Sequence, residues 1–299
     1  MYKTVLLMFL VFVMSGNLTN SFAQQPGSMQ KFILKTDNDL PSNSVELRLV
    51  INHGSLSEKD NELGFAHLVE HIAFNDTAKY PNETLIPFLE KSGLAIGIHS
   101  NASTGFDSTI YKLSLKDPDA KKLELAIEVL SQWAMHVQFN QKVIDAEKPV
   151  VKEEWRSSQA DKPGWRSKLF DTEYAGSHYL NREPIGDMEI IEAASAKDLE
   201  AFYKRWYQPQ NAAVIVSGDI DTEQVNTLVD QYFEDWKSDP ETTKTEYFVP
   251  IKSIPKLQVI SDANVDGSFV SFSFYQNFSR ANDVDGAYKI SQLRLGYIS

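Results

Sequence analysis

The alternation of hydrophobic and polar residues predicts a chain that mixes strands with helices. Residues 45–51 read Val-Glu-Leu-Arg-Leu-Val-Ile, and this period of two is typical of a strand with one buried face. Residues 64–73 place apolar side chains three and four positions apart, as in an amphipathic helix. By the same criteria we expect strands at residues 95–103, 107–115 and 212–217, and helices at residues 83–91, 119–136, 141–156, 196–207 and 222–233.

Turn-forming residues support the helix predicted at residues 83–91. Asn82 is placed to cap its N-terminus, and Gly93 suits the left-handed position that follows many helices. Another predicted helix, at residues 141–156, contains Pro149 inside an otherwise helical pattern.

The first residues of the chain have the pattern of an export signal. Lys3 precedes an apolar run, and a small-x-small cleavage pattern ends at Ala23. We therefore expect a signal peptide at residues 1–23 and a periplasmic or extracellular location. Residues 24–30 are polar and read as a flexible lead.

The domain boundaries follow from a later change in composition. Residues 238–256 are rich in Pro, Thr and charged residues and read as a linker. We therefore expect one α+β domain at residues 31–237 and the truncated start of a second at residues 257–299.

The composition narrows the chemistry open to the protein. The 299-residue chain contains no cysteine, so any metal site must use His and carboxylate side chains. The formal net charge of −12 argues against nucleic acid as a partner, because nucleic-acid binders cluster positive charge. No later stretch is long and apolar enough to span a bilayer, so we expect no membrane attachment after signal cleavage.

The motif richest in chemistry lies in the helix predicted at residues 64–73. It reads His-Leu-Val-Glu-His at residues 67–71, the H-x-x-E-H order of inverted zincins. His67 and His71 are four positions apart and share one helix face, so both rings can reach a single Zn²⁺. Glu70 lies near the same face, where it can act as general base toward a metal-activated water.

Two His ligands leave such a site incomplete, because catalytic zinc usually has three protein ligands. The acidic segment at residues 147–154 contains the best candidates for the third. Glu147 and Glu154 are two helical turns apart and can share a face, whereas Glu153 points elsewhere. A Glu-rich helix is also common as a plain solvated surface, and the spacing alone leaves that alternative open.

Several segments together resemble the pitrilysin/insulinase superfamily of zinc peptidases, especially its bacterial exported members. Residues 64–75, Gly-Phe-Ala-His-Leu-Val-Glu-His-Ile-Ala-Phe-Asn, are similar to that family's active-site helix nearly residue by residue. Residues 147–156 resemble the helix that supplies its third ligand, and residues 100–111 its substrate-binding edge strand. Further landmarks match at residues 182–186 and 206–211.

This resemblance implies an α+β fold, with a mostly antiparallel sheet and helices packed on one face. It also implies one Zn²⁺ per chain, held by His67, His71 and Glu154, with Glu70 as the general base. Glu147 matches a second acidic residue that the family uses near its site, and is a further catalytic candidate.

The implied reaction is hydrolysis of extended peptides or unfolded protein segments. A peptide would add to the edge strand as an extra strand, read mainly through its backbone. The predicted substrate contacts are Asn101, Ala102 and Ser103. Without the resemblance, Asn101 reads equally well as a residue that caps its own strand.

The family is built from two halves that close around a chamber. The resemblance therefore implies a partner half or a missing C-terminal half, and intact metal chemistry with weak or absent turnover by this chain alone. Two alternatives stay open: a non-catalytic peptide-binding or scaffold subunit, or an inactive fragment that needs its partner half. The intact set His67, Glu70, His71 and Glu154 favours the enzyme.

Overall fold

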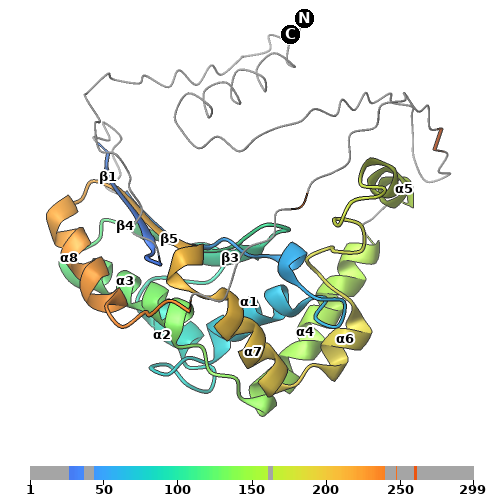
Figure 1. Ribbon diagram of the computed structural model, residues 1–299. Coiled ribbons are helices and arrows are strands. Elements are labelled where there is room, and N and C mark those ends of the chain that lie inside the picture. The colour runs from blue at the N-terminus through green and yellow to red at the C-terminus, as the bar shows by residue number, and fades with distance from the viewer. Residues whose placement is uncertain (1–26, 37–43, 161–163, 240–246, 248–258, 261–299) are drawn as a thin grey trace, which may run out of the picture.

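The computed structural model describes residues 27–36, 44–160, 164–239, 247 and 259–260 (Figure 1). The predicted signal peptide lies outside them, as do nearly all of the predicted linker and of the second domain's start. Among the helices that are described, none combines the length and apolarity needed to cross a membrane.

One five-stranded sheet organises the fold, in the order β1-β5-β2-β4-β3. Only the β1–β5 pair is parallel, so the sheet is mostly antiparallel, as predicted. Strand β3 lies at an edge of this sheet. The strands are β1 (Gln30–Lys35), β2 (Ser44–Ile51), β3 (Ser100–Thr104), β4 (Thr109–Lys116) and β5 (Ala212–Gly218).

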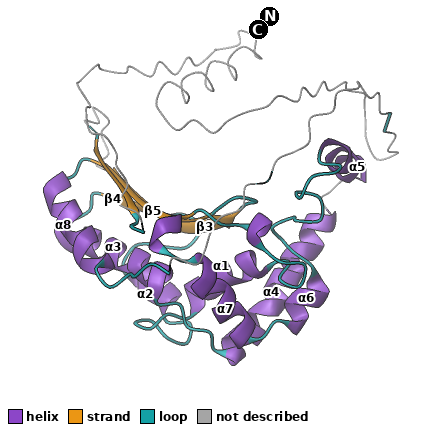
Figure 2. Cartoon of the chain, in the orientation of Figure 1, coloured by secondary structure: helices purple, strands orange, loops and turns teal. Residues whose placement is uncertain are grey.

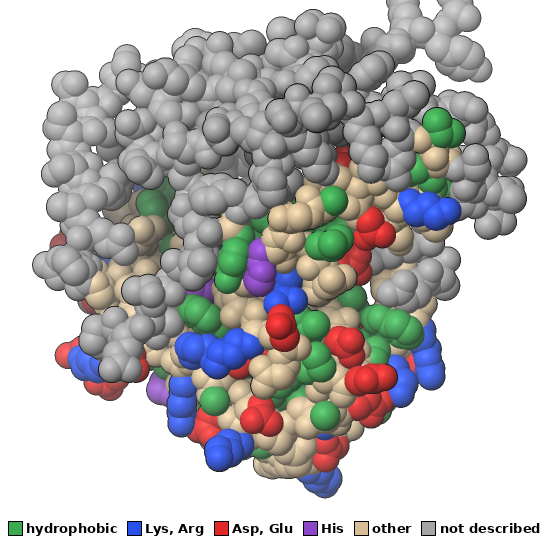
Figure 3. Space-filling view, turned by 45° about the vertical axis from the view of Figure 1, so that its right-hand side comes forward, with side chains coloured by type: hydrophobic (Ala, Val, Ile, Leu, Met, Phe, Trp, Pro, Cys, Tyr) green, Lys and Arg blue, Asp and Glu red, His purple; other side chains and the backbone are tan. Residues whose placement is uncertain are grey.

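The helices lie on one side of this sheet (Figure 2), which confirms the predicted layering, apart from α5 (Gly164–Glu173), which stands beyond the end of the sheet. They are α1 (Phe65–Asn75), α2 (Leu85–Lys91), α3 (Ala120–Met135), α4 (Gln141–Ala160), α5 (Gly164–Glu173), α6 (Met188–Ala193), α7 (Ala196–Trp206) and α8 (Thr222–Phe233). Two 3₁₀ turns, η1 (Ser55–Ser57) and η2 (Pro209–Asn211), complete the described elements. Acidic and basic side chains are mixed over the helical part of the face shown in Figure 3.

The core lies between sheet and helices and fixes the position of α1. Leu47 and Leu49 of β2 are fully buried, because strand alternation turns them toward the helices. Leu68 and Ile72 of α1 are fully buried as well. Each such side chain contributes about 1.5–3 kcal/mol, so the apolar face of α1 is held firmly against the sheet. The opposite face of α1 is left to carry the H-x-x-E-H side chains.

The structure corrects the predicted start of α2. The helix begins at Leu85, and Asn82 does not cap it, because Asn82 and Glu83 both have left-handed backbone conformations with φ of 53° and 63°. The predicted C-terminal glycine is confirmed: Gly93 has φ of 77° and follows the cap residue Ser92.

The first part of the predicted strand at residues 95–103 is a turn. The N–H groups of His99 and Ser100 both donate to the carbonyl of Ala95, so β3 begins only at Ser100. The sequence pattern also missed β1, whose first residue overlaps the predicted lead, and the short helices α5 and α6.

Candidate metal centre

A buried carboxylate and a close glycine pair set the N-terminus of α1. The N-cap residue Gly64 has φ of 96° and no side chain that could accept a capping hydrogen bond. The carboxylate of Glu58 takes this role, because it accepts hydrogen bonds from the N–H groups of Gly64 at 3.0 Å and Ala66 at 2.8 Å. Burial raises the pKa of Glu58 to about 8, although these two hydrogen bonds and the charge of Arg182 oppose the shift. A Cβ on Gly186 would lie 2.2 Å from the Cα of Gly64, so the backbones meet directly.

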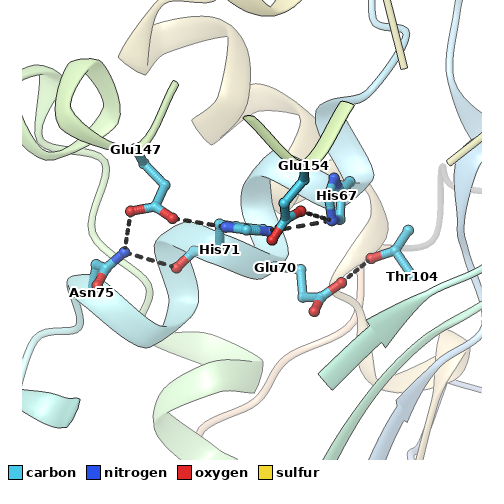
Figure 4. Close-up of polar contacts among 7 residues, drawn as sticks. All are labelled: His67, Glu70, His71, Asn75, Thr104, Glu147 and Glu154. Carbon is cyan, nitrogen blue, oxygen red and sulfur yellow. Dashed lines mark hydrogen bonds and ion pairs between the residues drawn. The ribbon is translucent and has the colours of Figure 1, made fainter. Parts of the chain in front are cut away.

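Three candidate ligand atoms converge beside α1. Nε2 of His67 and Nε2 of His71 are 3.2 Å apart, and Oε2 of Glu154 lies 3.5 Å from both (Figure 4). Ligand atoms around a tetrahedral zinc ion, with bonds of about 2.0–2.1 Å, are themselves about 3.3–3.4 Å apart. The triangle therefore has the size of one face of a zinc tetrahedron, and the donor set suits zinc.

The two imidazoles differ in proton affinity. Burial, and then the charge of His71, lower the pKa of His67 to about 4. Burial also works against the charged form of His71, but its hydrogen bonds to Glu147 and Glu154 prevail and raise its pKa to about 10. With these pKa values, His67 is neutral near neutral pH while His71 carries an additional proton as an imidazolium, and a metal ion that binds Nε2 of His71 must displace it.

Glu147 lies behind His71 rather than among the converging atoms. Its Oε1 is 2.7 Å from Nδ1 of His71, and its Oε2 accepts a hydrogen bond from Nδ2 of Asn75 at 2.8 Å (Figure 4). Asn75 also donates to the carbonyl of His71. This carboxylate–histidine arrangement fixes the ring and its tautomer, so that Nε2 points at the metal position.

Helix α4 carries both Glu147 and Glu154 and is tied to its neighbour α6. Nζ of Lys152 on α4 forms an ion pair with Oε1 of Glu192 on α6 at 2.5 Å. The neighbouring side chain of Val151 is fully buried, so α4 also packs into the core. Glu153 points away from the site and pairs with Arg156. The helical phase of α4 thus selects Glu154 and excludes its neighbour.

Glu70 faces the end of β3. The hydroxyl of Thr104 donates to Oε2 of Glu70 at 2.5 Å. Burial raises the pKa of Glu70, while this hydrogen bond and the charge of His71 oppose the shift. A carboxylate with a raised pKa next to a metal position is suited to accept and release a proton.

These residues line a cleft of about 730 Å³ between α1, α4 and the edge strand β3. Asn101, Ala102 and Ser103, predicted as substrate contacts, are part of its wall. Its remaining lining is largely apolar, and no Lys or Arg is among its described lining residues. The cleft's charged lining groups are Glu70, Glu147 and Glu154, with the two imidazoles beside them.

The structure thus brings together all the residues predicted for the site. Sequence reasoning missed two: Asn75 and Thr104. A signal existed for each, because Asn75 follows His71 by one helical turn, and Thr104 follows Ala102 by one strand repeat.

Comparisons with known proteins place this geometry in a family. Residues 34–180 match the model described as Insulinase (Peptidase family M16), and residues 193–288 match the one described as Peptidase M16 inactive domain. A probable zinc protease PqqL from Haemophilus influenzae is 39% identical over 272 residues, which cover 90% of this chain and 28% of that protein.

Solved structures agree. The first half of the periplasmic protease PqqL from Escherichia coli has a TM-score of 0.71 and 33% identity, covering 76% of this chain and 48% of that one. A ferredoxin protease in complex with Arabidopsis ferredoxin has a TM-score of 0.69 and 28% identity, covering 76% of this chain and 25% of that one. Two models of the same family match most of the chain, and the fold around the H-x-x-E-H helix agrees with them. The chain therefore belongs to the insulinase family of peptidases, family M16.

Proposed function

We propose that this chain carries the catalytic centre of a zinc-dependent endopeptidase that hydrolyses extended peptides or unfolded protein segments. The observation that supports this best is the triangle of His67, His71 and Glu154 atoms, with sides of 3.2 and 3.5 Å, on the wall of a cleft that also holds Glu70. The chain spans 28% of the length of the curated relative from Haemophilus influenzae, so the activity of the whole protein is part of this proposal.

His67, His71 and Glu154 would hold one Zn²⁺ per chain. When bound there, Zn²⁺ polarises a peptide carbonyl and lowers the pKa of a water toward about 7. Glu147 holds His71 in the orientation and tautomer that this requires.

Glu70 would be the general base. Thr104 occupies Oε2, which leaves Oε1 to take the proton of the attacking water and pass it to the leaving amine. The raised pKa of Glu70, which results chiefly from burial, makes its carboxylate a stronger base and so assists the first of these transfers. Glu147 takes no part in the proton transfer and acts by positioning His71.

The substrate would bind as an added strand along β3, next to Asn101, Ala102 and Ser103. The edge position of β3 and the largely apolar cleft wall both support an extended, uncharged stretch of peptide. Backbone pairing explains why unfolded segments of varied sequence would be accepted.

We further propose export to the periplasm or the cell exterior, and assembly with a partner half or a C-terminal half. The predicted signal peptide and the periplasmic relative from Escherichia coli support the first. That relative's solved first half is itself about twice the length matched here, since this chain covers 48% of it, which supports the second. Weak turnover by the isolated chain follows from this proposal.

Zinc stoichiometry of the purified chain tests the metal centre. We expect one equivalent in the wild type and a large loss in Glu154→Gln. Glu153→Gln is the matched control, because Glu153 is one residue away on α4 and contacts Arg156 instead of the site. Zinc binding that is the same in all three chains would refute the ligand role of Glu154.

Glu70→Gln separates the enzyme from a non-catalytic binding subunit. In an enzyme, the substituted protein keeps its zinc and its peptide binding but loses hydrolysis. Hydrolysis that continues in Glu70→Gln would exclude Glu70 as the base. A zinc-loaded protein that binds peptide, but cleaves none even with its partner half present, would be a binding subunit.

A further inference from the structure

Among the described residues, β3 forms a ladder only with β4, apart from an isolated bridge between Ser100 and Ile96. Two hydrogen-bonded pairs fix the phase of that ladder. At the hairpin turn the N–H of Gly105 donates to the carbonyl of Ser108, and at the far end the N–H of Ser114 donates to the carbonyl of His99. In an antiparallel ladder such pairs recur at every second residue.

The free edge of β3 can be read from this phase. Asn101 and Ser103 direct their backbone N–H and C=O groups at β4. Ala102 and Thr104 therefore direct theirs outward, away from the sheet. These outward groups are the ones with which an added peptide strand would pair.

The free edge is closed at the N-terminal end of β3. Ser100 also faces outward, but its N–H donates to Ala95 and its carbonyl accepts from the N–H of Gly97. At the other end β3 stops at Thr104, just before the hairpin turn that leads into β4. Two outward-facing residues of β3, Ala102 and Thr104, are left for a peptide. The side-chain hydroxyl of Thr104 also bonds Glu70.

One of these two residues is already capped. Oδ1 of Asn101 accepts the N–H of Ala102 at 2.9 Å. Asn101 is exposed, and this hydrogen bond places its amide oxygen against an outward-facing N–H of the strand edge. An amide oxygen at this place resembles the peptide carbonyl that a substrate strand would present.

We propose that the Asn101 side chain is an internal stand-in for substrate, which caps the edge of β3 and must leave when a peptide binds. This inference rests on the proposed function and refines it. It changes Asn101 from an attractive contact into a competitor, so it reverses the expected effect of its removal.

The physical reasons are edge protection and exchange of hydrogen bonds. An unpaired edge invites pairing with other chains, and proteins commonly block such edges. A substrate carbonyl that replaces Asn101 gains one hydrogen bond only after another is broken. Since a net intramolecular hydrogen bond is worth about 0.5–1.5 kcal/mol, loss of the cap should tighten peptide binding about two- to tenfold.

Amide hydrogen exchange of Ala102 tests the cap directly, without peptide. In the zinc-loaded chain we expect exchange about two- to tenfold faster in Asn101→Ala than in wild type. Asn101→Asp keeps an acceptor oxygen and should exchange like wild type. Ser103→Ala is the matched control, because Ser103 shares the phase of Asn101 but bonds no edge group. Equal exchange in wild type and Asn101→Ala would overturn the proposal.

Peptide binding tests the consequence. The probe is a blocked, fluorescein-labelled octapeptide of alternating Val and Ser, and Glu70→Gln serves as the background that prevents cleavage. Fluorescence anisotropy should show tighter binding when Asn101→Ala is added, and the affinity of the Glu70→Gln background when Asn101→Asp, which keeps the acceptor oxygen, is added instead. Equal or weaker binding with Asn101→Ala would overturn the competitor role.

Failure of the proposed function looks different from failure of this inference. If neither the Glu70→Gln background nor any variant made in it binds the peptide, docking at the β3 edge is wrong. The exchange of the Ala102 amide still decides whether Asn101 is a cap. If all bind and only the order of affinities is reversed, the docking site stands and the competitor role falls.

Discussion

Oε1 of Glu147 lies 2.7 Å from Nδ1 of His71, whereas Glu154 faces the other ring nitrogen, Nε2. The second oxygen of the same carboxylate is held by Asn75 at 2.8 Å. Glu147 is therefore locked between two residues of α1, and it can orient the imidazole without touching the metal position. Two Glu residues of α4 thus act on the same His from opposite sides.

The first prediction concerns this support. Glu147→Gln should weaken zinc binding about 10- to 100-fold, the usual cost of losing a carboxylate behind a His ligand. Competition with a chromophoric chelator measures the affinity. Glu153→Gln should bind zinc like wild type, because Glu153 pairs with Arg156. Unchanged affinity in Glu147→Gln would show that His71 is oriented by other contacts.

Zinc binding should release close to one proton near neutral pH. His71, with a pKa raised to about 10, is protonated in the metal-free chain, while His67, with a pKa lowered to about 4, is not. Because the metal-free state holds this additional proton on His71, and zinc binding must release it, the affinity for zinc should rise with pH. The expected rise is about tenfold per pH unit between pH 6 and 8. Calorimetry in buffers of different ionisation enthalpy counts the protons.

Glu147→Gln supplies the control for this count. Loss of the charge beside Nδ1 lowers the pKa of His71, so the substituted protein should release clearly less than one proton at pH 8. Equal proton release in both proteins would mean that the displaced proton does not come from His71.

The local part of this site was predictable, and the tertiary part was not. His67, Glu70 and His71 follow from helical periodicity, because one turn of α1 brings them together whatever surrounds it. The spacing of Glu147 and Glu154 predicts only a shared face. Their distinct positions, at Nδ1 and near Nε2 of His71, depend on how α4 is placed against α1.

The edge strand shows the same limit. Residues 100–103 were assigned to a strand, but its phase depends on the turn between β3 and β4. Thr104 lies one residue beyond the predicted end, and it is the residue that reaches Glu70. Strand β1 was missed because its partner β5 is distant in sequence, and no local pattern reports such pairing.

Thr104→Val tests the contact to the general base. Loss of a hydrogen bond to a charged group costs about 1.5–3 kcal/mol, so kcat/KM for peptide hydrolysis should fall about 10- to 100-fold. The loss should be in kcat, with zinc affinity unchanged, because Thr104 touches no ligand atom. Thr104→Ser keeps the hydroxyl and should recover most of the rate. A change in KM alone would assign Thr104 to substrate binding only.

The contact between Gly64 and Gly186 makes a prediction about stability. A Cβ at residue 186 would lie 2.2 Å from the Cα of Gly64 and 2.7 Å from the carbonyl oxygen of Leu63, and its φ of 77° is left-handed. Backbone must therefore move, and Gly186→Ala should lower the free energy of unfolding by about 3–5 kcal/mol. Urea denaturation measures this loss, and zinc affinity should fall with it, since α1 begins at this contact.

Gly97→Ala separates the close approach from the backbone conformation. Gly97 has a similar φ of 81°, but nothing lies within 4 Å of the position that its Cβ would take. Only the left-handed conformation is then penalised, and the expected loss is about 1–2 kcal/mol with unchanged zinc affinity. Equal losses of stability at the two positions would mean that the Gly64–Gly186 contact relaxes easily. Zinc binding that survives in Gly186→Ala would show that the ligands keep their positions without this contact.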